Sequence, residues 1–375
     1  MMNLFYPRTF LSLLIGLFLS ASISAQVKYS NEFLSLGVGA RAQGMSTAQV
    51  ANVSDVMSTY WNPAGLVYLD APLQLGIMHA EWFAGIAQYD YIGFAKPLNP
   101  EKQSAIGLSI IRLGIDNIPN TLNLIGADGS INYENVTEFS AADYAVFFSY
   151  AQNVKIKGRT FAMGGNAKII RRVIGTFGNS WGFGIDFGIQ YRGDKWQFGL
   201  MARDVTSTFN AWSFGLTDRE KLVFETTGND IPESSVEVTR PQFILGAARK
   251  FRVNSKVEIL AEMNWHFTTD GQRNVLVSSE ALNIDPFLGV ELGYRKTLFL
   301  RTGVGKFQES LDDDGSGDKI WTFQPTLGVG LKIGRFFIDY AFTDVGNVSQ
   351  VQYSNIFSVK LNFKERKKLP QLNTQ

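Results

Sequence analysis

Two histidines, an absence of cysteine and one regularly spaced acidic cluster define the chemistry open to this chain. His79 and His266 are its only imidazoles, so a Ser-His-Asp arrangement would have to use one of them. Without cysteine, disulfides, thiol catalysis and thiolate metal sites are excluded. His266 shares a predicted strand face with Glu258 and Glu262, but carboxylates beside a histidine are more often a network that balances nearby Arg and Lys. We therefore expect no enzymatic activity.

The acidic cluster occupies residues 312–318 and reads DDDGSGD. Oxygen-bearing side chains at Asp312, Asp314, Ser316 and Asp318 repeat the alternate spacing with which calcium loops wrap a hard cation. The twelfth position of such a loop, which would carry a bidentate Glu, is Phe323. Two hypotheses remain open, a calcium site formed by Asp312, Asp314 and Asp318 or a solvated acidic loop tip, and the missing Glu favours the second. No other cofactor is expected.

Charge and glycine patterns exclude two further classes of ligand. The chain has 35 basic and 34 acidic residues, a net charge of +1, which argues against nucleic acid as a partner. The glycine cluster GVGARAQG at residues 37–44 does not have the spacing of a dinucleotide fingerprint, and no strand-to-helix unit surrounds it. We interpret these glycines as positions of close packing.

Strands are expected to position these side chains. The clearest strand pattern lies at residues 180–205, which form two strands and the loop between them. Alternate positions from Trp181 to Tyr191 are large and apolar, whereas the residues between them are small or polar. Gly193-Asp194 predicts a two-residue hairpin loop that places Tyr191 opposite Trp196. These strands are longer than the roughly 5–6 residues of soluble proteins and are long enough to cross a bilayer. A membrane barrel, in which one face of each strand meets lipid and the other meets a polar lumen, is therefore favoured over a soluble sandwich.

Fourteen alternating segments follow residue 71, and an even number is expected of a single-chain bacterial barrel. They cover about residues 72–80, 85–95, 104–113, 142–151, 160–172, 180–192, 195–204, 241–251, 255–267, 286–296, 297–306, 322–333, 335–344 and 353–363. The even-numbered links are short, and most odd-numbered links are long, notably 114–141, 205–240, 268–285 and 307–321. Short periplasmic turns and long external loops are typical of outer-membrane barrels. We predict an all-β, closed, antiparallel, fourteen-stranded transmembrane β-barrel.

Four regions are predicted along the chain. Residues 1–25 form a cleaved secretory signal, because Arg8 precedes an apolar run at residues 10–19 and then small residues. Residues 26–71 do not alternate and are rich in Gly, Ala and Ser, which indicates a segment of short helices and turns. Residues 72–363 form the barrel, and residues 364–375 are a basic tail expected in the periplasm.

Ionisable residues on the polar strand faces are expected to line the lumen. They are Asp186, Glu258, Glu262, Glu291, Arg295, Arg301, Lys332 and Asp339.

Residues 33–66 resemble a known family. SLGVGARAQGM (residues 35–45) and YWNPAGL (residues 60–66) are similar to the N-terminal signature of the PorV/PorQ family, which itself resembles the FadL family of fourteen-stranded outer-membrane transporters. The specific part is the motif Trp61, Asn62, Pro63, Ala64 and Gly65. The FadL resemblance implies that residues 26–71 are a hatch plugging the barrel and that hydrophobic ligands leave sideways through its wall. The PorV resemblance implies a role in type IX secretion, with the translocon and exported proteins as partners.

The sequence analysis therefore predicts a non-catalytic barrel in the outer membrane of a Gram-negative bacterium, in contact with its lipid. A PorV/PorQ-type accessory subunit or shuttle of the type IX secretion system is the first hypothesis. A FadL-like passive transporter of hydrophobic small molecules is the alternative.

Overall fold

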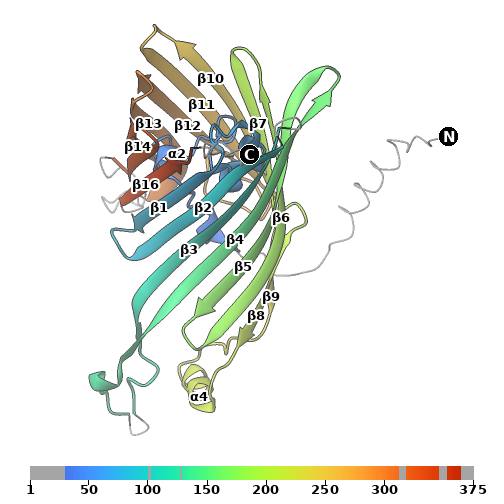
Figure 1. The fold of residues 1–375 in the computed structure, drawn as a ribbon. Coiled ribbons are helices and arrows are strands. Elements are labelled where there is room, and N and C mark those ends of the chain that lie inside the picture. The colour runs from blue at the N-terminus through green and yellow to red at the C-terminus, as the bar shows by residue number, and fades with distance from the viewer. Residues whose placement is uncertain (1–29, 100–102, 127–128, 312–317, 346–352, 365–375) are drawn as a thin grey trace, which may run out of the picture.

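The computed structural model describes residues 30–99, 103–126, 129–311, 318–345 and 353–364. These residues form a barrel whose strands enclose the N-terminal segment (Figure 1). The predicted signal peptide and nearly all of the predicted tail lie outside the described residues. Among the described residues, no helix is long and apolar enough to cross a membrane.

The described helices are short. They are η1 (Glu32–Ser35), α2 (Ala40–Gln43), α3 (Ser58–Trp61), η2 (Pro63–Tyr68), η3 (Tyr133–Asn135) and α4 (Asp218–Thr226). The strands are β1 (Gln74–Trp82), β2 (Ala87–Asn99), β3 (Ser104–Asn120), β4 (Thr137–Ile156), β5 (Arg159–Ile174), β6 (Gly178–Arg192), β7 (Trp196–Arg203), β8 (Thr208–Phe214), β9 (Val236–Thr239), β10 (Gln242–Arg252), β11 (Val257–Thr268), β12 (Asn283–Tyr294), β13 (Leu298–Leu311), β14 (Lys319–Ile333), β15 (Phe336–Thr343) and β16 (Ser354–Asn362).

The sixteen segments make fourteen strands, because two strands are interrupted. Residues 187–192 of β6 pair with β7, and residues 178–183 of the same strand pair with β8. β7 and β8 are thus two parts of one strand, broken at residues 204–207, where Asp204 and Ser207 have positive φ. β9 and β10 likewise pair with β8 and β7 and are separated by Arg240 and Pro241. The β5–β6 and β1–β16 pairings complete the ring, so the predicted closed barrel is confirmed.

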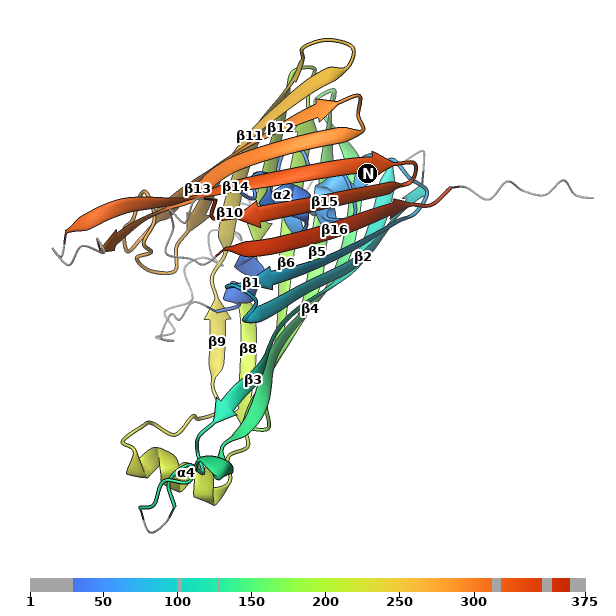
Figure 2. The ribbon, with the colours of Figure 1, turned by 90° about the vertical axis from the view of Figure 1, so that its left-hand side faces the viewer.

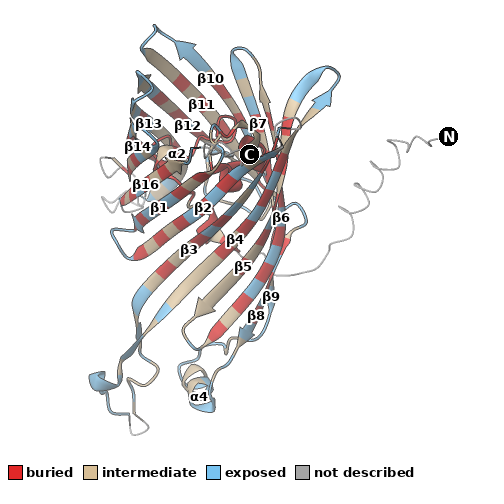
Figure 3. Ribbon diagram, viewed as in Figure 1, coloured by how far each residue is buried: buried red, intermediate tan, exposed pale blue. Residues whose placement is uncertain are grey.

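The two predicted faces of the strands are also confirmed, and β6 shows them most clearly. Trp181, Phe183, Ile185 and Phe187 are 51%, 61%, 50% and 40% exposed, whereas the residues between them are buried. Figure 3 shows the same alternation as stripes along most strands. Large apolar side chains thus cover the outside of a closed barrel. Because exposing so many of them to water is unfavourable, this surface faces lipid.

The predicted hairpin register between β6 and β7 is wrong by two residues. Tyr191 lies opposite Phe198 rather than Trp196. The backbone N–H of Gly193 donates to the carbonyl of Trp196 over 2.9 Å, so the loop residues are Asp194 and Lys195. A shift of two residues keeps every side chain on its predicted face, because the strand period is two.

The predicted loop at residues 205–240 is wrong in part, because it contains β8, α4 and β9. The interruption at residues 204–207 changes the phase of the alternation. Before it, Met201 is buried, and after it Thr208, Asn210 and Trp212 are buried. A continuous period-two pattern is therefore absent from this strand. β3 and β4 likewise extend to Asn120 and from Thr137, into the predicted loop at residues 114–141.

The long connections gather at one end of the barrel. α4 and the β3–β4 connection lie at this end, which is at the bottom of Figures 1 and 2, and the short turns lie at the opposite end. We call these the long-loop end and the short-turn end. The wall is uneven, since β3 and β4 reach far towards the long-loop end whereas β1 ends at Trp82 (Figure 2).

Candidate functional site in the lumen

The N-terminal segment, residues 30–69, occupies the lumen and shares its largest apolar cluster with the wall. Tyr60 and Trp61 of α3 are each 2% exposed, and their rings meet edge to face with centroids 4.8 Å apart. The indole N–H of Trp61 donates to the carbonyl of Val38 over 2.8 Å. On the wall side, Phe147 of β4 packs edge to face against Tyr60, and Tyr89 of β2 belongs to the same cluster. Aromatic rings thus fix the segment against β2 and β4.

Asn62 connects this segment to the opposite part of the wall. Its backbone is extended where α3 ends, and its side-chain oxygen accepts from the N–H of Ala64 over 3.2 Å. Its amide nitrogen lies 3.0 Å from the carbonyl of Val50, and 3.1 and 3.3 Å from those of Ile189 and Leu200. Pro63 then begins η2, where its missing N–H costs no hydrogen bond. All five residues of the Trp61–Gly65 motif are buried in the lumen.

Wall glycines allow the backbone of the segment to approach the strands. A Cβ at Gly188 would lie 2.1 Å from the side-chain oxygen of Asn62, and one at Gly199 would lie 2.4 Å from the carbonyl oxygen of Val50. At Gly44 and Gly328 the backbone of the segment lies directly against the backbone of β14. The sequence analysis missed this role and assigned the glycines of the inner face only to a polar lumen. Their repetition at alternate strand positions was the available signal.

Gly164 and Gly165 of β5 give a direct test of this packing, because they are adjacent and face opposite sides of the wall. A Cβ at Gly164 would lie 2.6 Å from the carbonyl carbon of Pro63, whereas one at Gly165 would meet only a carbonyl oxygen, at 3.3 Å. Gly164→Ala should therefore lower the free energy of unfolding by about 1–3 kcal/mol, the usual cost of overpacking. Gly165→Ala is the matched control and should cost much less in urea titrations of the folded barrel. Equal losses would place the segment away from β5.

Charged residues gather on the short-turn side of the segment. Arg41 of α2 donates to both oxygens of Glu291, at 2.8 and 3.0 Å. Arg301 donates to Glu291 over 2.7 Å and to Asp339 over 2.8 Å, and its side chain is 3% exposed. Three of the residues predicted to line the lumen thus meet in one buried network with Arg41, which the sequence analysis had not singled out.

A second ion pair connects the segment to the last strand. Lys360 of β16 donates to the Asp55 carboxylate. Burial alone would raise the pKa of Asp55, but Lys360 and Arg41 outweigh it and lower this pKa below its usual value. Asp55 therefore stays ionised, and the segment is held by charge as well as by apolar packing.

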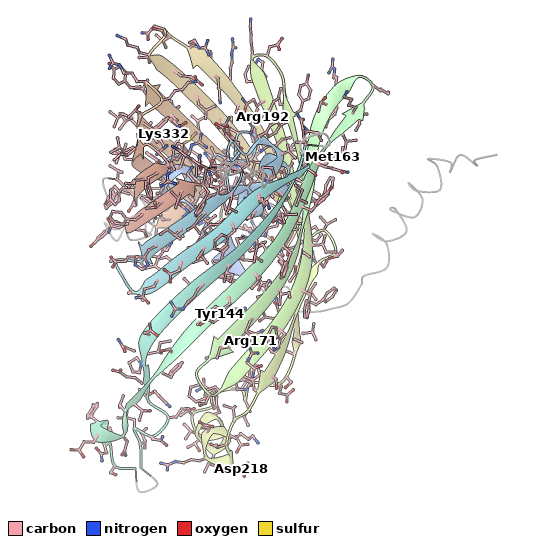
Figure 4. The ribbon with its side chains drawn as sticks, viewed as in Figure 1. Tyr144, Met163, Arg171, Arg192, Asp218 and Lys332 are labelled. Atoms are coloured by element: carbon pink, nitrogen blue, oxygen red, sulfur yellow. The ribbon has the colours of Figure 1, made fainter. Side chains whose placement is uncertain are left out.

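These charges border a vestibule of about 1060 Å³ between the segment and the short turns. Glu258, Arg295 and Lys332, all predicted to line the lumen, contribute to its lining. Figure 4 shows Lys332 and Arg192 near this end of the barrel. Arg295 lies at an exposed turn, so it is at the rim. Glu262 is buried apart from the vestibule and accepts from the backbone N–H of Ala51 over 2.7 Å.

Asp186 lies elsewhere, beside the interruption between β7 and β8. Lys168 of β5 lies 2.7 Å from Asp186 and 2.6 Å from Asp204, and all three residues are buried. The backbone N–H of Asp204 donates to Asp186, and that of Val205 donates to the carbonyl of Ile185 over 2.8 Å. A cavity of about 30 Å³ separates this cluster from the first described residues of the segment. The sequence analysis identified Asp186 but not Lys168 or Asp204.

The remaining candidate groups do not meet. His79 faces outward and pairs with Asp90 over 2.7 Å, whereas His266 faces inward and packs against Phe287 with ring centroids 4.4 Å apart. Asp312 and Asp314 lie outside the described residues, and Asp318 directly precedes β14. In the part of the chain that the structure describes, no group of three or more His, Cys, Asp or Glu residues could hold a metal ion.

Comparison with known proteins identifies the fold. No protein-family model matches the chain, and no curated protein does. Among solved structures, the toluene transporter TodX of Pseudomonas putida aligns with a TM-score of 0.53 and 13% identity, covering 88% of this chain and 99% of that one. CymD, a monoaromatic hydrocarbon channel, aligns with a TM-score of 0.51 and 13% identity, also covering 88% and 99%. These similarities support the predicted FadL-like barrel, and they give no support to the PorV/PorQ assignment.

Proposed function

We propose that this chain is an outer-membrane channel for hydrophobic small molecules and that residues 30–69 act as its hatch. The observation that carries the proposal is the division of the lumen by this segment. Its contacts with β2–β4 are mostly aromatic and aliphatic, whereas those towards the short turns are ionic. A pore for hydrophilic solutes would need a polar path on both sides. An apolar molecule instead finds matching surface on one side only.

The same division suggests a route. An apolar molecule entering from the long-loop end meets the cluster that contains Tyr60, Tyr89 and Phe147. Crossing the charged vestibule would be unfavourable for it, because that space is lined by Arg, Lys, Asp and Glu. The interruption between β7 and β8, where regular pairing with β6 stops, is a place where the wall could open sideways once the buried ion pairs of Lys168 with Asp186 and Asp204 separate. The similar structures are a toluene transporter and a monoaromatic hydrocarbon channel, which supports this class of ligand.

The secretion role remains as a second candidate. The motif Trp61–Gly65 carries the PorV/PorQ resemblance, and one structural feature favours a partner within the membrane. A groove of about 730 Å³ on the outside of the wall is lined by apolar side chains that include Phe94, Leu108, Phe148 and Ile185. A membrane-spanning partner with a complementary apolar surface could pack there in place of lipid.

Purification in mild detergent tests the two functions against each other. The channel proposal predicts that the barrel elutes without protein partners and that mass spectrometry finds apolar small molecules bound to it. Recovery of a very large barrel or of exported proteins with this chain, and no bound apolar molecule, would replace the channel by the secretion role.

A further inference from the structure

A row of polar and aromatic side chains crosses the outside of the wall from β1 to β6. The strand registers place each residue directly opposite the next. The row is His79, Asp90, Arg112, Tyr144, Arg171 and Trp181. All six lie on the outward face, since their sequence neighbours in these strands face the lumen. Figure 4 shows Tyr144 and Arg171 beside each other on β4 and β5, in the half of the wall nearer the long loops.

The next outward row towards the short-turn end is entirely apolar. It consists of Ile77, Ile92, Ile110, Val146, Ile169 and Phe183. An Arg among lipid chains is strongly unfavourable at the bilayer midplane and costs close to nothing at the interface. The change from isoleucine to arginine over two residues therefore marks the boundary between hydrocarbon and headgroups on this part of the wall.

Both arginine side chains extend away from the hydrocarbon. The guanidinium of Arg112 lies over Gly114, where a Cβ would be 2.5 Å from its terminal nitrogen. Arg171 donates to the side-chain oxygen of Asn179 over 2.6 Å, and Asn179 is paired with Val173. Gly114 and Val173 each lie two residues nearer the long-loop end than their arginine. The two side chains thus snorkel in the same direction, towards the headgroup layer.

The charges of the row are only partly compensated by the protein. Asp90 lies 3.4 Å from Arg112 and 2.7 Å from His79, so it is shared between them. Arg171 has no ion pair among the described residues. Its contacts are the neutral Asn179, the carbonyl of Ser180 and the ring of Trp181, whose centroid is 4.8 Å away. Tyr144 lies between the two arginines in the register, and its hydroxyl is a hydrogen-bond partner of Arg112.

We propose that Arg112, Tyr144 and Arg171 bind the phosphate of a lipid headgroup in the leaflet nearer the long-loop end. A guanidinium matches a phosphate with two parallel hydrogen bonds, and two arginines flanking a hydroxyl can hold one phosphate between them. The acyl chains of that lipid would lie against the isoleucine row. This site is on the outside of the wall, so it is independent of the channel function proposed for the lumen.

Native mass spectrometry of the delipidated full barrel with bisphosphorylated lipid A as the probe tests the proposal. The unmodified barrel should retain this lipid, and the variant Arg112→Gln/Arg171→Gln should bind it about tenfold more weakly or worse, because both charge-assisted contacts with the phosphate are lost. Dephosphorylated lipid A should bind both proteins with the weaker affinity.

Arg249→Gln is the matched control. Arg249 is an outward arginine over the rings of Trp196 and Phe251, so like Arg171 it packs on a Trp ring, but it lies at the short-turn end. This variant should bind lipid A as the unmodified barrel does, and heat-dependent gel mobility should show that all variants are folded. Equal retention of phosphorylated and dephosphorylated lipid, or equal losses in Arg249→Gln and the double variant, would overturn the proposal.

Discussion

Deleting residues 33–66 should leave a barrel that still assembles but conducts small hydrophilic solutes continuously. The ring of strands closes through β1–β16 and β5–β6, and neither pairing uses the N-terminal segment. That segment nevertheless fills the lumen between the apolar cluster and the vestibule. Removing it would join the vestibule to the long-loop end through a space lined by wall glycines, charged side chains and the wall part of the apolar cluster, and water could then cross the barrel.

Planar-bilayer recordings measure this effect. The unmodified barrel should be closed, and the deletion should give a steady conductance. Trp61→Ala should give brief openings, because truncating a buried Trp costs about 3–5 kcal/mol of packing without removing the segment. A closed deletion variant that is folded by its gel mobility would show that residues 33–66 do not form the barrier.

Arg301→Met should cause one of the largest losses of stability available from a single substitution in this chain. Among the described residues, Arg301 alone connects Glu291 to Asp339, and its replacement leaves Asp339 buried without an ion pair to any of them. Breaking a buried charge network in this way costs about 3–5 kcal/mol. The loss should appear as a lower urea midpoint for the refolded barrel.

Two further variants make that result specific. Lys319→Met removes an ion pair with Glu309 in which the lysine side chain is 68% exposed, and it should cost less than about 1 kcal/mol. Combining Arg301→Met with Asp339→Asn should recover part of the loss, since the uncompensated carboxylate is then neutral. Similar midpoints for Arg301→Met and Lys319→Met would contradict the buried network.

The barrel itself could be predicted because period two is a strong local signal. From Trp181 to Tyr191 of β6 every outward position is large and apolar and every inward one is small or polar, so both the strand and its faces follow from the residues. The interrupted strand β7–β8 could not be predicted in the same way. Its break at residues 204–207 depends on Lys168, Asp186 and Asp204, which come together only after β5, β6 and β7 are paired.

The site was predictable as a set of residue types rather than as an arrangement. Inward-facing Glu291, Arg301 and Asp339 follow from alternation, but their common partner Arg41 belongs to the non-alternating N-terminal segment. The contacts of Asn62 with Ile189 and Leu200 likewise join positions more than a hundred residues apart. The motif Trp61–Gly65 resembles a secretion family, whereas the solved structures with a similar fold are a toluene transporter and a monoaromatic hydrocarbon channel.

Hydrocarbon uptake by intact cells tests the channel proposal most directly. The full chain would be expressed in a Gram-negative host that has no hydrocarbon channel of its own, and entry of labelled toluene would be compared with entry of a sugar of similar size. The account predicts faster initial uptake of toluene at unchanged sugar entry, because the hatch excludes hydrophilic solutes while the apolar cluster admits the ring. Unchanged toluene uptake by cells whose membranes contain the folded barrel would contradict it.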